Sequence, residues 1–293
     1  MSMVFATAAV RADLANYQSV VSGQSPTYYN TFDNTLVPTT GSGTFTAATA
    51  GAGFGSDLFG NANHAASFTA NSDYLTGPAS IISGAGTTGT VGTPVVGTLS
   101  LLFRTGDSLP NTGYFFSDSE TVATSAAGSQ AARSAFALQF NGGAISFDLG
   151  DKKNALSGVS MVIDSWYYFA VTYSFDGTSA GDTATWYLGA AGGSLSSGSL
   201  TVTSGLSIVG DGSTFVVGNK QATVVGIPAT STAGAGAHPA IDELATWNTG
   251  LTSGQIQSQF GAVQPAPEPS TYALLGIGGL LVLFARRKKL SGI

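Results

Sequence analysis

Few residues in this sequence could carry out acid–base, nucleophilic or metal chemistry. The chain has 293 residues and no cysteine, so thiol nucleophiles, thiolate metal sites and disulfides are excluded. Its histidines are His64 and His238, and its glutamates are Glu120, Glu243 and Glu268. The two histidines lie far apart in sequence, so a zinc site with three or four ligands would depend on scattered carboxylates. Both histidines are interpreted more simply as polar surface residues.

One acidic pair, Asp242 and Glu243, lies within the apolar stretch Ala240-Ile-Asp-Glu-Leu-Ala245. Two neighbouring carboxyl groups could act as the acid and base of a hydrolytic site. They could also complete hydrogen bonds at the end of a strand, which is the commoner role of polar groups in such a setting. We expect the second, structural role.

Two other patterns could bind ligands. Gly84-Ala-Gly-Thr-Thr-Gly89 matches a dinucleotide fingerprint as a string, but the residues up to Pro94 cannot start the helix that would bind a pyrophosphate. We therefore predict a loop there. Calcium is an open alternative, because carboxylates in or beside predicted loops could hold it. These acids are Asp73, Asp118, Glu120, Asp148, Asp151 and Asp211. They form no recognisable ladder of calcium ligands, so any metal site stays unassigned.

The composition indicates one large domain made of strands. Hydrophobic residues make up 43% of the chain and charged residues only 9%, against about 25% charged residues in average domains. The 40 glycines are about twice the average usage. They are spread among Ser, Thr and Ala, which suits short strands joined by turns and excludes a helical bundle. The net charge of −6 leaves no basic patch for phosphates, which excludes nucleic acid as a partner.

The body of the chain contains many short runs rich in Val, Phe, Tyr, Trp and Thr, each bounded by turn-forming residues. The clearest strand candidates are Thr98 to Arg104, Ser134 to Phe140, Ala144 to Leu149, Trp166 to Phe175, Thr183 to Leu188, Phe215 to Gly218 and Ala240 to Trp247. Asn141-Gly-Gly143 predicts a hairpin. The run from Trp166 to Tyr173 can be covered on both faces, as in an inner strand. Capping-box spacing from Thr252 to Gln255 predicts one helix, which Gly261 can end.

The order of these strand candidates and of the helix along the chain resembles that of laminin-G-like domains of the concanavalin A-like lectin/glucanase superfamily. The resemblance covers about residues 15 to 262 and begins with Ser25-Pro-Thr-Tyr-Tyr29 and Phe68-Thr-Ala-Asn-Ser-Asp-Tyr-Leu75. It implies an all-β fold, an antiparallel two-sheet jelly-roll sandwich, and lectin-like binding of glycan or protein. Glucanases of this superfamily carry Glu-Ile-Asp-x-x-Glu on one strand. Ala240 and Ala245 stand where the two glutamates would be, so we expect no enzyme.

A second resemblance lies at the C-terminus. Pro267-Glu268-Pro269 precedes the uncharged run from Tyr272 to Ala285, and Arg286, Arg287 and two lysines follow it. This order resembles the PEP-CTERM sorting signal of Gram-negative bacteria. It implies recognition by a membrane-embedded exosortase, transient anchoring in the inner membrane by a short hydrophobic helix, cleavage near the motif, and delivery to the cell surface or exopolysaccharide matrix. The run of 14 residues from 272 to 285 would span only about 21 Å as a helix, which suits a transient anchor.

An exported protein also needs an N-terminal signal. Met1 to Val10 is short and mostly apolar, and small residues precede a cleavage position after Ala12, but a basic n-region is lacking. The sequence thus predicts a truncated signal peptide (1–12), a jelly-roll domain (13–262), a proline-rich linker (263–271), a sorting helix (272–285) and a basic cytoplasmic tail (286–293). The leading hypothesis is a non-enzymatic surface or matrix protein that binds glycan or protein. The alternatives are a purely structural matrix component and an atypical glycan hydrolase.

Overall fold

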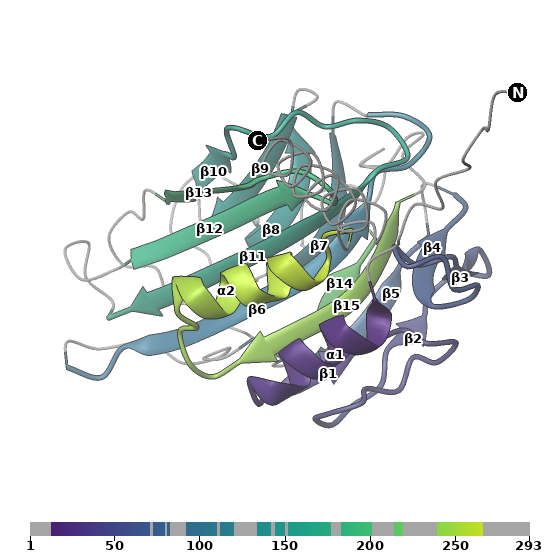
Figure 1. Cartoon of the computed structure of the whole chain (residues 1–293). Coiled ribbons are helices and arrows are strands. Elements are labelled where there is room, and N and C mark those ends of the chain that lie inside the picture. The colour runs from purple at the N-terminus through teal and green to yellow at the C-terminus, as the bar shows by residue number, and fades with distance from the viewer. Residues whose placement is uncertain are drawn as a thin grey trace, which may run out of the picture.

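The computed structural model describes residues 13–70, 73–79, 81–82, 92–109, 112–119, 134–141, 144–149, 152–176, 183–200, 214–218 and 239–265. These residues form two antiparallel β-sheets stacked face to face, with two helices on the outer face of one of them (Figure 1). We call the sheet that carries the helices the front sheet and the other the back sheet. The predicted all-β sandwich is confirmed.

The front sheet has the strand order β13-β12-β11-β6-β15-β4-β3, and β1 also pairs with β15. Its strands are β1 (Tyr28–Asn30), β3 (Ala52–Gly55), β4 (Ala65–Phe68), β6 (Val95–Arg104), β11 (Trp166–Phe175), β12 (Thr183–Ala190), β13 (Leu195–Ser199) and β15 (Ala240–Trp247). The last strand, β15, therefore lies beside the long strand β6 in the middle of the sheet. This crossover brings the end of the domain to its centre.

The back sheet has the order β10-β9-β8-β7-β14-β5-β2. Its strands are β2 (Thr46–Ala47), β5 (Leu75–Ala79), β7 (Thr112–Ser119), β8 (Ser134–Asn141), β9 (Ala144–Leu149), β10 (Lys152–Ala155) and β14 (Thr214–Val217). The predicted strand pair β8 and β9 is antiparallel, and Asn141 faces Ala144 across the hairpin. The predicted turn residues Gly142 and Gly143 lie outside the described residues.

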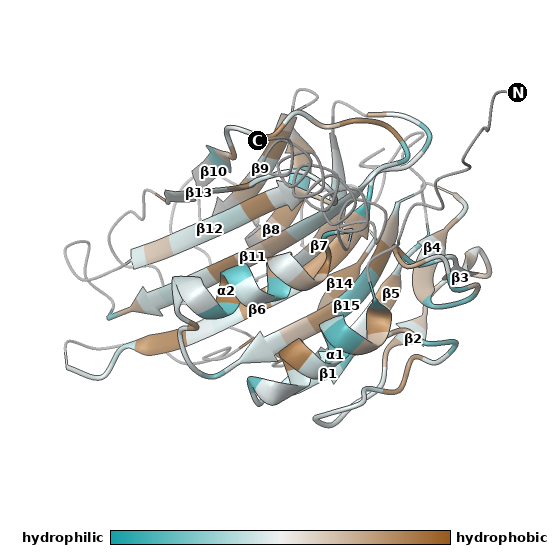
Figure 2. Ribbon diagram, viewed as in Figure 1, coloured by the Kyte–Doolittle hydropathy of each residue, from teal (hydrophilic) through white to brown (hydrophobic). Residues whose placement is uncertain are grey.

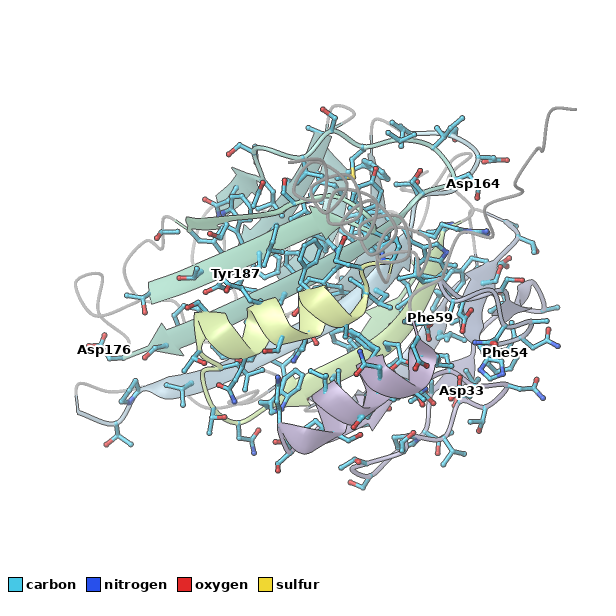
Figure 3. All side chains as sticks on the ribbon, in the orientation of Figure 1. Asp33, Phe54, Phe59, Asp164, Asp176 and Tyr187 are labelled. Carbon is cyan, nitrogen blue, oxygen red and sulfur yellow. The ribbon has the colours of Figure 1, made fainter. Side chains whose placement is uncertain are left out.

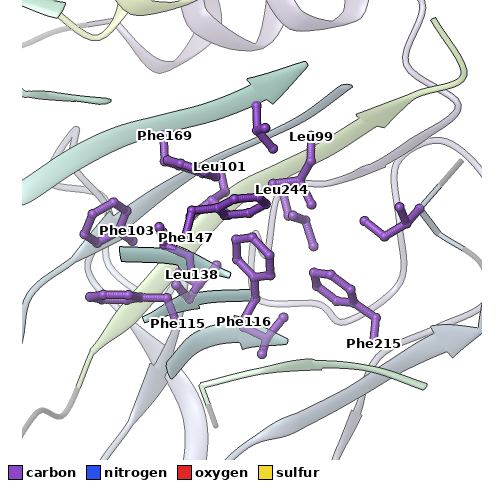
Figure 4. Close-up of a cluster of buried hydrophobic side chains, with 14 of the residues drawn as sticks. Leu99, Leu101, Phe103, Phe115, Phe116, Leu138, Phe147, Phe169, Phe215 and Leu244 are labelled. Atoms are coloured by element: carbon purple, nitrogen blue, oxygen red, sulfur yellow. The ribbon is translucent and has the colours of Figure 1, made fainter. Parts of the chain in front are cut away.

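Aromatic side chains fill the space between the two sheets (Figure 4). Phe103 from the front sheet and Phe115 from the back sheet have ring centroids 4.3 Å apart. Phe147 and Phe169 meet in the same way at 5.5 Å. Such tilted pairs are favoured by the charge distribution of aromatic rings. The sheets are thus joined by direct contacts between rings of opposite layers.

The first half of strand β11 is covered on both faces, as its sequence predicts, whereas the outward side chains Thr172 and Ser174 are partly exposed. Tyr167 and Phe169 join the core between the sheets, whereas Tyr168 and Ala170 face the helices. Figure 2 shows long hydrophobic stretches on β6 and β11, the strands in the middle of the front sheet. A sheet that is apolar on both faces needs a layer on each side. The back sheet supplies one layer and the helices supply the other.

The two helices are α1 (Leu14–Gly23) and α2 (Ser253–Ala262). The capping box predicted for α2 is formed: Gln255 N donates to Thr252 Oγ1 at 3.3 Å, and Thr252 N donates to Gln255 Oε1 at 2.9 Å. The helix continues through Gly261 to Ala262, so the expected end was slightly too early. Helix α1 was not predicted, because Asp13 caps it without a capping box.

The helices contact each other through glutamine side chains. Gln259 Nε2 of α2 donates to Gln24 Oε1 at 2.6 Å, just after the end of α1. Gln259 Oε1 accepts a hydrogen bond from the Tyr168 hydroxyl of β11 at 2.8 Å. Trp247 of β15 donates its indole N–H to the Gln24 carbonyl at 3.0 Å. Each of these buried polar groups therefore has a partner, which fixes the helix layer on the sheet.

The predicted N-terminal segment 1–12, the hydrophobic helix 272–285 and the basic tail 286–293 lie outside the described residues, as does the linker beyond Pro265. In the part of the chain that is described, no helix is both long and apolar enough to cross a membrane.

The contact of α2 with the front sheet leaves no room at Gly189 of β12. A Cβ atom added there would lie 2.5 Å from the Phe260 ring and 3.0 Å from the Ser194 carbonyl oxygen. We expect Gly189→Ala to lower the free energy of unfolding by about 1–3 kcal/mol through overpacking. Gly53→Ala in β3, where no atom lies within 4 Å of the new Cβ, is the matched control. Equal midpoints for both variants in urea unfolding would contradict this packing.

Candidate functional site

The acidic pair Asp242 and Glu243 lies inside β15, where the backbone forms a bulge. Pairing with β6 shifts register between Asp242 and Ala245, and Glu243 has a φ of 54°, in the left-handed region. Ile241 and Leu244 point into the core between the sheets, and Ala245 points toward the helices. The bulge therefore places both acids on the helix-covered face, because the extra residue interrupts the alternation of side chains.

Glu243 is held by two neighbours. The Tyr29 hydroxyl of β1 donates to Glu243 Oε2, and Gln18 Nε2 of α1 donates to Glu243 Oε1 at 2.9 Å. Gln18 Nε2 also lies 3.1 Å from Asp33 Oδ2. Asp33 Oδ1 in turn lies 2.6 Å from His64 Nδ1. A chain of polar contacts thus runs from the buried strand β15 through α1 to the loop after β1.

His64 departs from its expected role as a surface residue. Its side chain is only about one-third exposed and contacts Asp33 directly. Asp57 lies in the same region: it is buried and accepts hydrogen bonds from Asn61, whose backbone N lies 2.7 Å from Asp57 Oδ1. We call Asp33, Asp57, Asp242 and Glu243 the acid cluster. Asp33 and Asp57 gave no sequence signal for it, because they reach β15 only in the folded chain.

Burial dominates the electrostatics of Asp242 and Glu243. Loss of solvent raises the pKa of Glu243 to about 8, and the charges of Asp33 and Asp57 add to the rise, while hydrogen bonds from Tyr29 and Gln18 oppose it. Burial, followed by the charge of Glu243, raises the pKa of Asp242 well above its ordinary value. Neutral carboxyl groups are the expected form, since an ionised carboxylate in such surroundings is costly.

Three polar atoms around Asp242 lack a hydrogen-bond partner. Asp242 Oδ1 accepts from the backbone N of Glu243 at 2.8 Å, but Oδ2 has no partner. The Tyr17 hydroxyl of α1 and the Ser100 hydroxyl of β6 are also buried and unpaired. Such groups are destabilising when they are left alone. The contact between α1 and β15 is therefore polar, tight and incompletely satisfied.

The acid cluster has the residue types of a hydrolytic site but not its access. Asp242 and Glu243 are fully buried beneath α1. Ala240 and Ala245, at the positions of the glucanase glutamates, are also fully buried and carry no carboxyl group. A glycosidase needs two carboxyl groups on either side of a bound sugar. The geometry instead suits a polar contact that holds α1 on the sheet.

Of the expected calcium ligands, the structure describes only one side chain fully, that of Asp73. Asp118 and Asp148 lie in β7 and β9, and Glu120, Asp151 and Asp211 lie outside the described residues, as does His238. Asp73 is buried and accepts hydrogen bonds from Thr49 Oγ1 at 2.7 Å and from Ala70 N at 2.7 Å. Within the described ranges, no group of three or more His, Asp or Glu side chains is placed to hold a metal ion.

A second candidate region is the part of the front sheet that the helices leave uncovered. On its outer face β11, β12 and β13 carry hydroxyl side chains in register: Thr172 faces Thr185, and Thr185 faces Ser199. A second row pairs Ser174 with Thr183. All of these side chains are at least partly exposed. We call them, with Ser197, the hydroxyl face.

The hydroxyl face is uncharged and ends at an aromatic side chain. Tyr187 of β12 faces Ser197 of β13 and lies beside α2, where Figure 3 labels it. None of the outward-pointing residues of β11, β12 and β13 is charged. Hydroxyl groups both donate and accept hydrogen bonds, and neighbouring strands lie about 4.8 Å apart. The sequence contained the signal, a Ser or Thr at two alternate positions of each of the three strands: Thr172 and Ser174, Thr183 and Thr185, and Ser197 and Ser199.

Comparison with solved structures gives the class of the fold. The chain is similar to the binding domain of botulinum neurotoxin serotype D (14% identity, TM-score 0.51, 83% of this chain and 52% of that chain). It is equally similar to the ligand binding domain of that serotype in complex with N-acetylneuraminic acid (14% identity, TM-score 0.51, 83% and 52%). The receptor binding domain of the C/D mosaic serotype matches at 13% identity and TM-score 0.51 (81% and 51%).

These similarities show the fold alone, a jelly-roll β-sandwich. The chain spans about half the length of the solved structures that it matches. No curated protein matches the chain.

The C-terminus gives the more particular finding. Residues 265–289 match the PEP-CTERM protein-sorting motif. The predicted sorting residues Pro267, Glu268, Pro269, Arg286 and Arg287 fall within this match, outside the described residues. The motif implies recognition by an exosortase-type enzyme, export, and transient anchoring in the membrane through the C-terminus.

The contacts of Asp73 make a prediction about stability. Burial alone would raise the pKa of Asp73, but the hydrogen bonds from Thr49, Ala70 and Thr69 outweigh it and lower the pKa below 3.8. The ionised carboxylate therefore stabilises the fold above pH 4, and this contribution disappears as the pH falls further. We expect Asp73→Asn to cost about 1–3 kcal/mol at pH 7 and less at pH 3, measured by urea unfolding.

The control for this prediction is Asp164→Asn. Asp164 has a largely exposed side chain and one contact, 3.3 Å from Arg104. Its replacement should change stability by less than about 0.5 kcal/mol. A loss for Asp73→Asn no larger than that of the control, or a loss that persists at pH 3, would contradict the assigned role.

Proposed function

We propose that this chain is an exported, non-enzymatic protein of the cell surface or exopolysaccharide matrix, and that its sandwich domain binds glycan through the hydroxyl face. The observation that carries this proposal is the match of residues 265–289 to a sorting motif directly after a lectin-like sandwich. The motif supplies the route out of the cell. The sandwich supplies the exposed surface that would act at the destination.

Glycan is the ligand class that suits the hydroxyl face best. Sugars present many hydroxyl groups and few charges, so they match a surface of neutral donors and acceptors such as Thr172, Thr185 and Ser199. The serotype D neurotoxin domain was solved with a bound sugar acid. That likeness supports the fold alone, since half of that chain has no counterpart here.

The absence of catalysis is part of the proposal. Among the described residues, the carboxyl pair nearest to the glucanase motif, Asp242 and Glu243, is buried beneath α1. A substrate could reach it only if α1 left the sheet. The atypical hydrolase therefore ranks behind the binding protein.

Binding of calcium is a separate proposal. The body of the chain is acidic, and a matrix is often anionic, so repulsion would act over roughly 10 Å at about 0.1 M salt. A calcium ion held by loop carboxylates could bridge the two surfaces. Asp73 is already occupied by hydrogen bonds from Thr49 and Ala70, so other loop acids would have to supply the ligands.

The first prediction here concerns processing. In a Gram-negative host with an exosortase, we expect the mature protein to end near residues 265–271 and to lie outside the inner membrane. Intact-mass analysis of surface-released protein measures the end point. The Glu268→Ala variant, which disrupts the motif, should stay uncleaved in the membrane fraction. Surface protein that still ends at Ile293 would refute the processing step.

The second prediction concerns binding. We expect the mature protein to be retained on the host's exopolysaccharide, and Thr172→Val with Thr185→Val to weaken retention roughly tenfold or more, since each lost hydrogen bond costs about 1 kcal/mol. Ser199→Ala should also weaken it. Ser196→Ala is the matched control, because Ser196 lies on the same strand as Ser199 but not among the outward-pointing residues, and its hydroxyl donates to the Gly158 carbonyl at 3.3 Å.

Each other outcome of this experiment favours an alternative. Retention that is unchanged in the Thr172 and Thr185 variants would remove the hydroxyl face as the site. No retention at all would favour the purely structural matrix component. Retention that is lost with a chelator would support the calcium bridge, and equal retention with and without chelator would remove it. Steady release of reducing ends, abolished by Asp242→Asn, would make the chain a hydrolase.

A further inference from the structure

We propose that helix α1 is a pH-sensitive latch, which stays docked on the front sheet while Asp242 and Glu243 carry their protons and is released as these two groups ionise. The proposal concerns a conformational device and does not depend on glycan binding. It rests on the position of the cluster between β15 and α1. The helix is joined to β15 through groups whose contacts change when a carboxyl group loses its proton.

Gln18 is the direct link between α1 and the cluster. Its single side-chain nitrogen lies 2.9 Å from Glu243 Oε1 and 3.1 Å from Asp33 Oδ2, so one amide group bridges two acids. Tyr17, the preceding residue, buries its hydroxyl against the same region without a partner. Asp242 Oδ2 is likewise buried and unpaired. A negative charge on Asp242 or Glu243 would therefore lie under α1 with few groups to stabilise it.

The groups that face the cluster come from every element packed around it, and almost all are neutral or acidic. They are Tyr17 and Gln18 of α1, Tyr29 of β1, Asp33, Asp57 and His64 of the loops, Ser100 of β6, and Tyr168 of β11. His64 is paired with Asp33 at 2.6 Å. Arg104 of β6 contacts Asp164 instead, at 3.3 Å.

Two lysines remain among the described residues. They are Lys152 and Lys153, on β10 at the edge of the back sheet. Ionisation of Asp242 or Glu243 therefore adds negative charge close to Asp33 and Asp57, and among the described residues neither group forms an ion pair with a lysine or arginine. Repulsion and loss of solvation then act together against the docked helix.

The direction of the pH effect follows from the raised pKa values. In the docked state burial raises the pKa of Glu243 to about 8 from an ordinary 4.5, and raises that of Asp242 as well. Once α1 leaves, water reaches both groups and their pKa values return toward normal. The docked state therefore binds more protons, and docking is strongest at low pH. Between about pH 4.5 and pH 8, release becomes tenfold more favourable per pH unit for each proton given up.

Release would uncover apolar side chains of the front sheet. Phe59 lies against α1, with its ring centroid 6.2 Å from that of Tyr17, and Figure 3 labels it beside the helix. Leu102 and Ala245 belong to the same buried cluster. The latch would thus control whether this apolar face is exposed to solvent or covered by α1.

Hydrogen–deuterium exchange of the full-length chain between pH 5 and pH 9, corrected for intrinsic exchange rates, tests the latch. As the pH rises from 5 to about 8, we expect protection of the α1 amides to fall by up to tenfold per pH unit, while protection of the α2 amides stays constant. The double variant Asp242→Asn with Glu243→Gln keeps the shapes of the side chains and removes both titrations. Its α1 protection should not depend on pH. Asp164→Asn, which removes an exposed carboxyl group, should behave as wild type.

Two results would overturn the latch. One is α1 protection in the wild type that does not depend on pH, or that changes only together with α2, as in unfolding of the whole domain. The other is pH dependence that persists unchanged in the double variant. If the double variant does not fold, the comparison of α1 with α2 in the wild type still decides the question.

Discussion

The structure depends on covering the middle of the front sheet, which is apolar on both faces. Tyr167 and Phe169 of β11 need the back sheet, and Tyr168 and Ala170 need the helices. Each large side chain that is buried in this way contributes about 1.5–3 kcal/mol. The helices are therefore required by the strands that they cover, although they come from opposite ends of the domain. The contacts of Gln24 with Trp247 and Gln259 are how those two ends meet.

The side chains of β11 and β12 determine where the helix layer ends. On the outer face, β11 changes from Tyr168 and Ala170 to Thr172 and Ser174, and β12 changes from Tyr187 to Thr185 and Thr183 along the opposite direction. Because the strands are antiparallel, these changes coincide across the sheet. One half of the face is apolar and covered, and the other is hydroxyl-rich and open to water. A single sheet thus provides both a structural and a candidate binding surface.

Periodicity in the sequence predicted seven of the fifteen strands that the structure describes, because alternation and turn residues are local. These strands are β6, β8, β9, β11, β12, β14 and β15. The ranges of β9, β11 and β15 agree with the sequence prediction, and the capping box of α2 is formed. The acid cluster could not be predicted in the same way. It depends on a bulge at Glu243 and on Gln18, which lies 225 residues away in sequence. The strand pattern alone would have placed Asp242 and Glu243 on opposite faces.

The position of the sorting motif relative to α2 constrains how the folded domain can meet a membrane. Helix α2 ends at Ala262, and the motif match begins at residue 265. An extended chain covers at most about 3.6 Å per residue, so the few residues between them reach little more than about 10 Å. A processing enzyme that binds the motif would therefore work close to α2 and the front sheet. Because α2 is fixed to Tyr168 and Gln24, the front sheet, with its hydroxyl face, would stay near the membrane until the chain is cut.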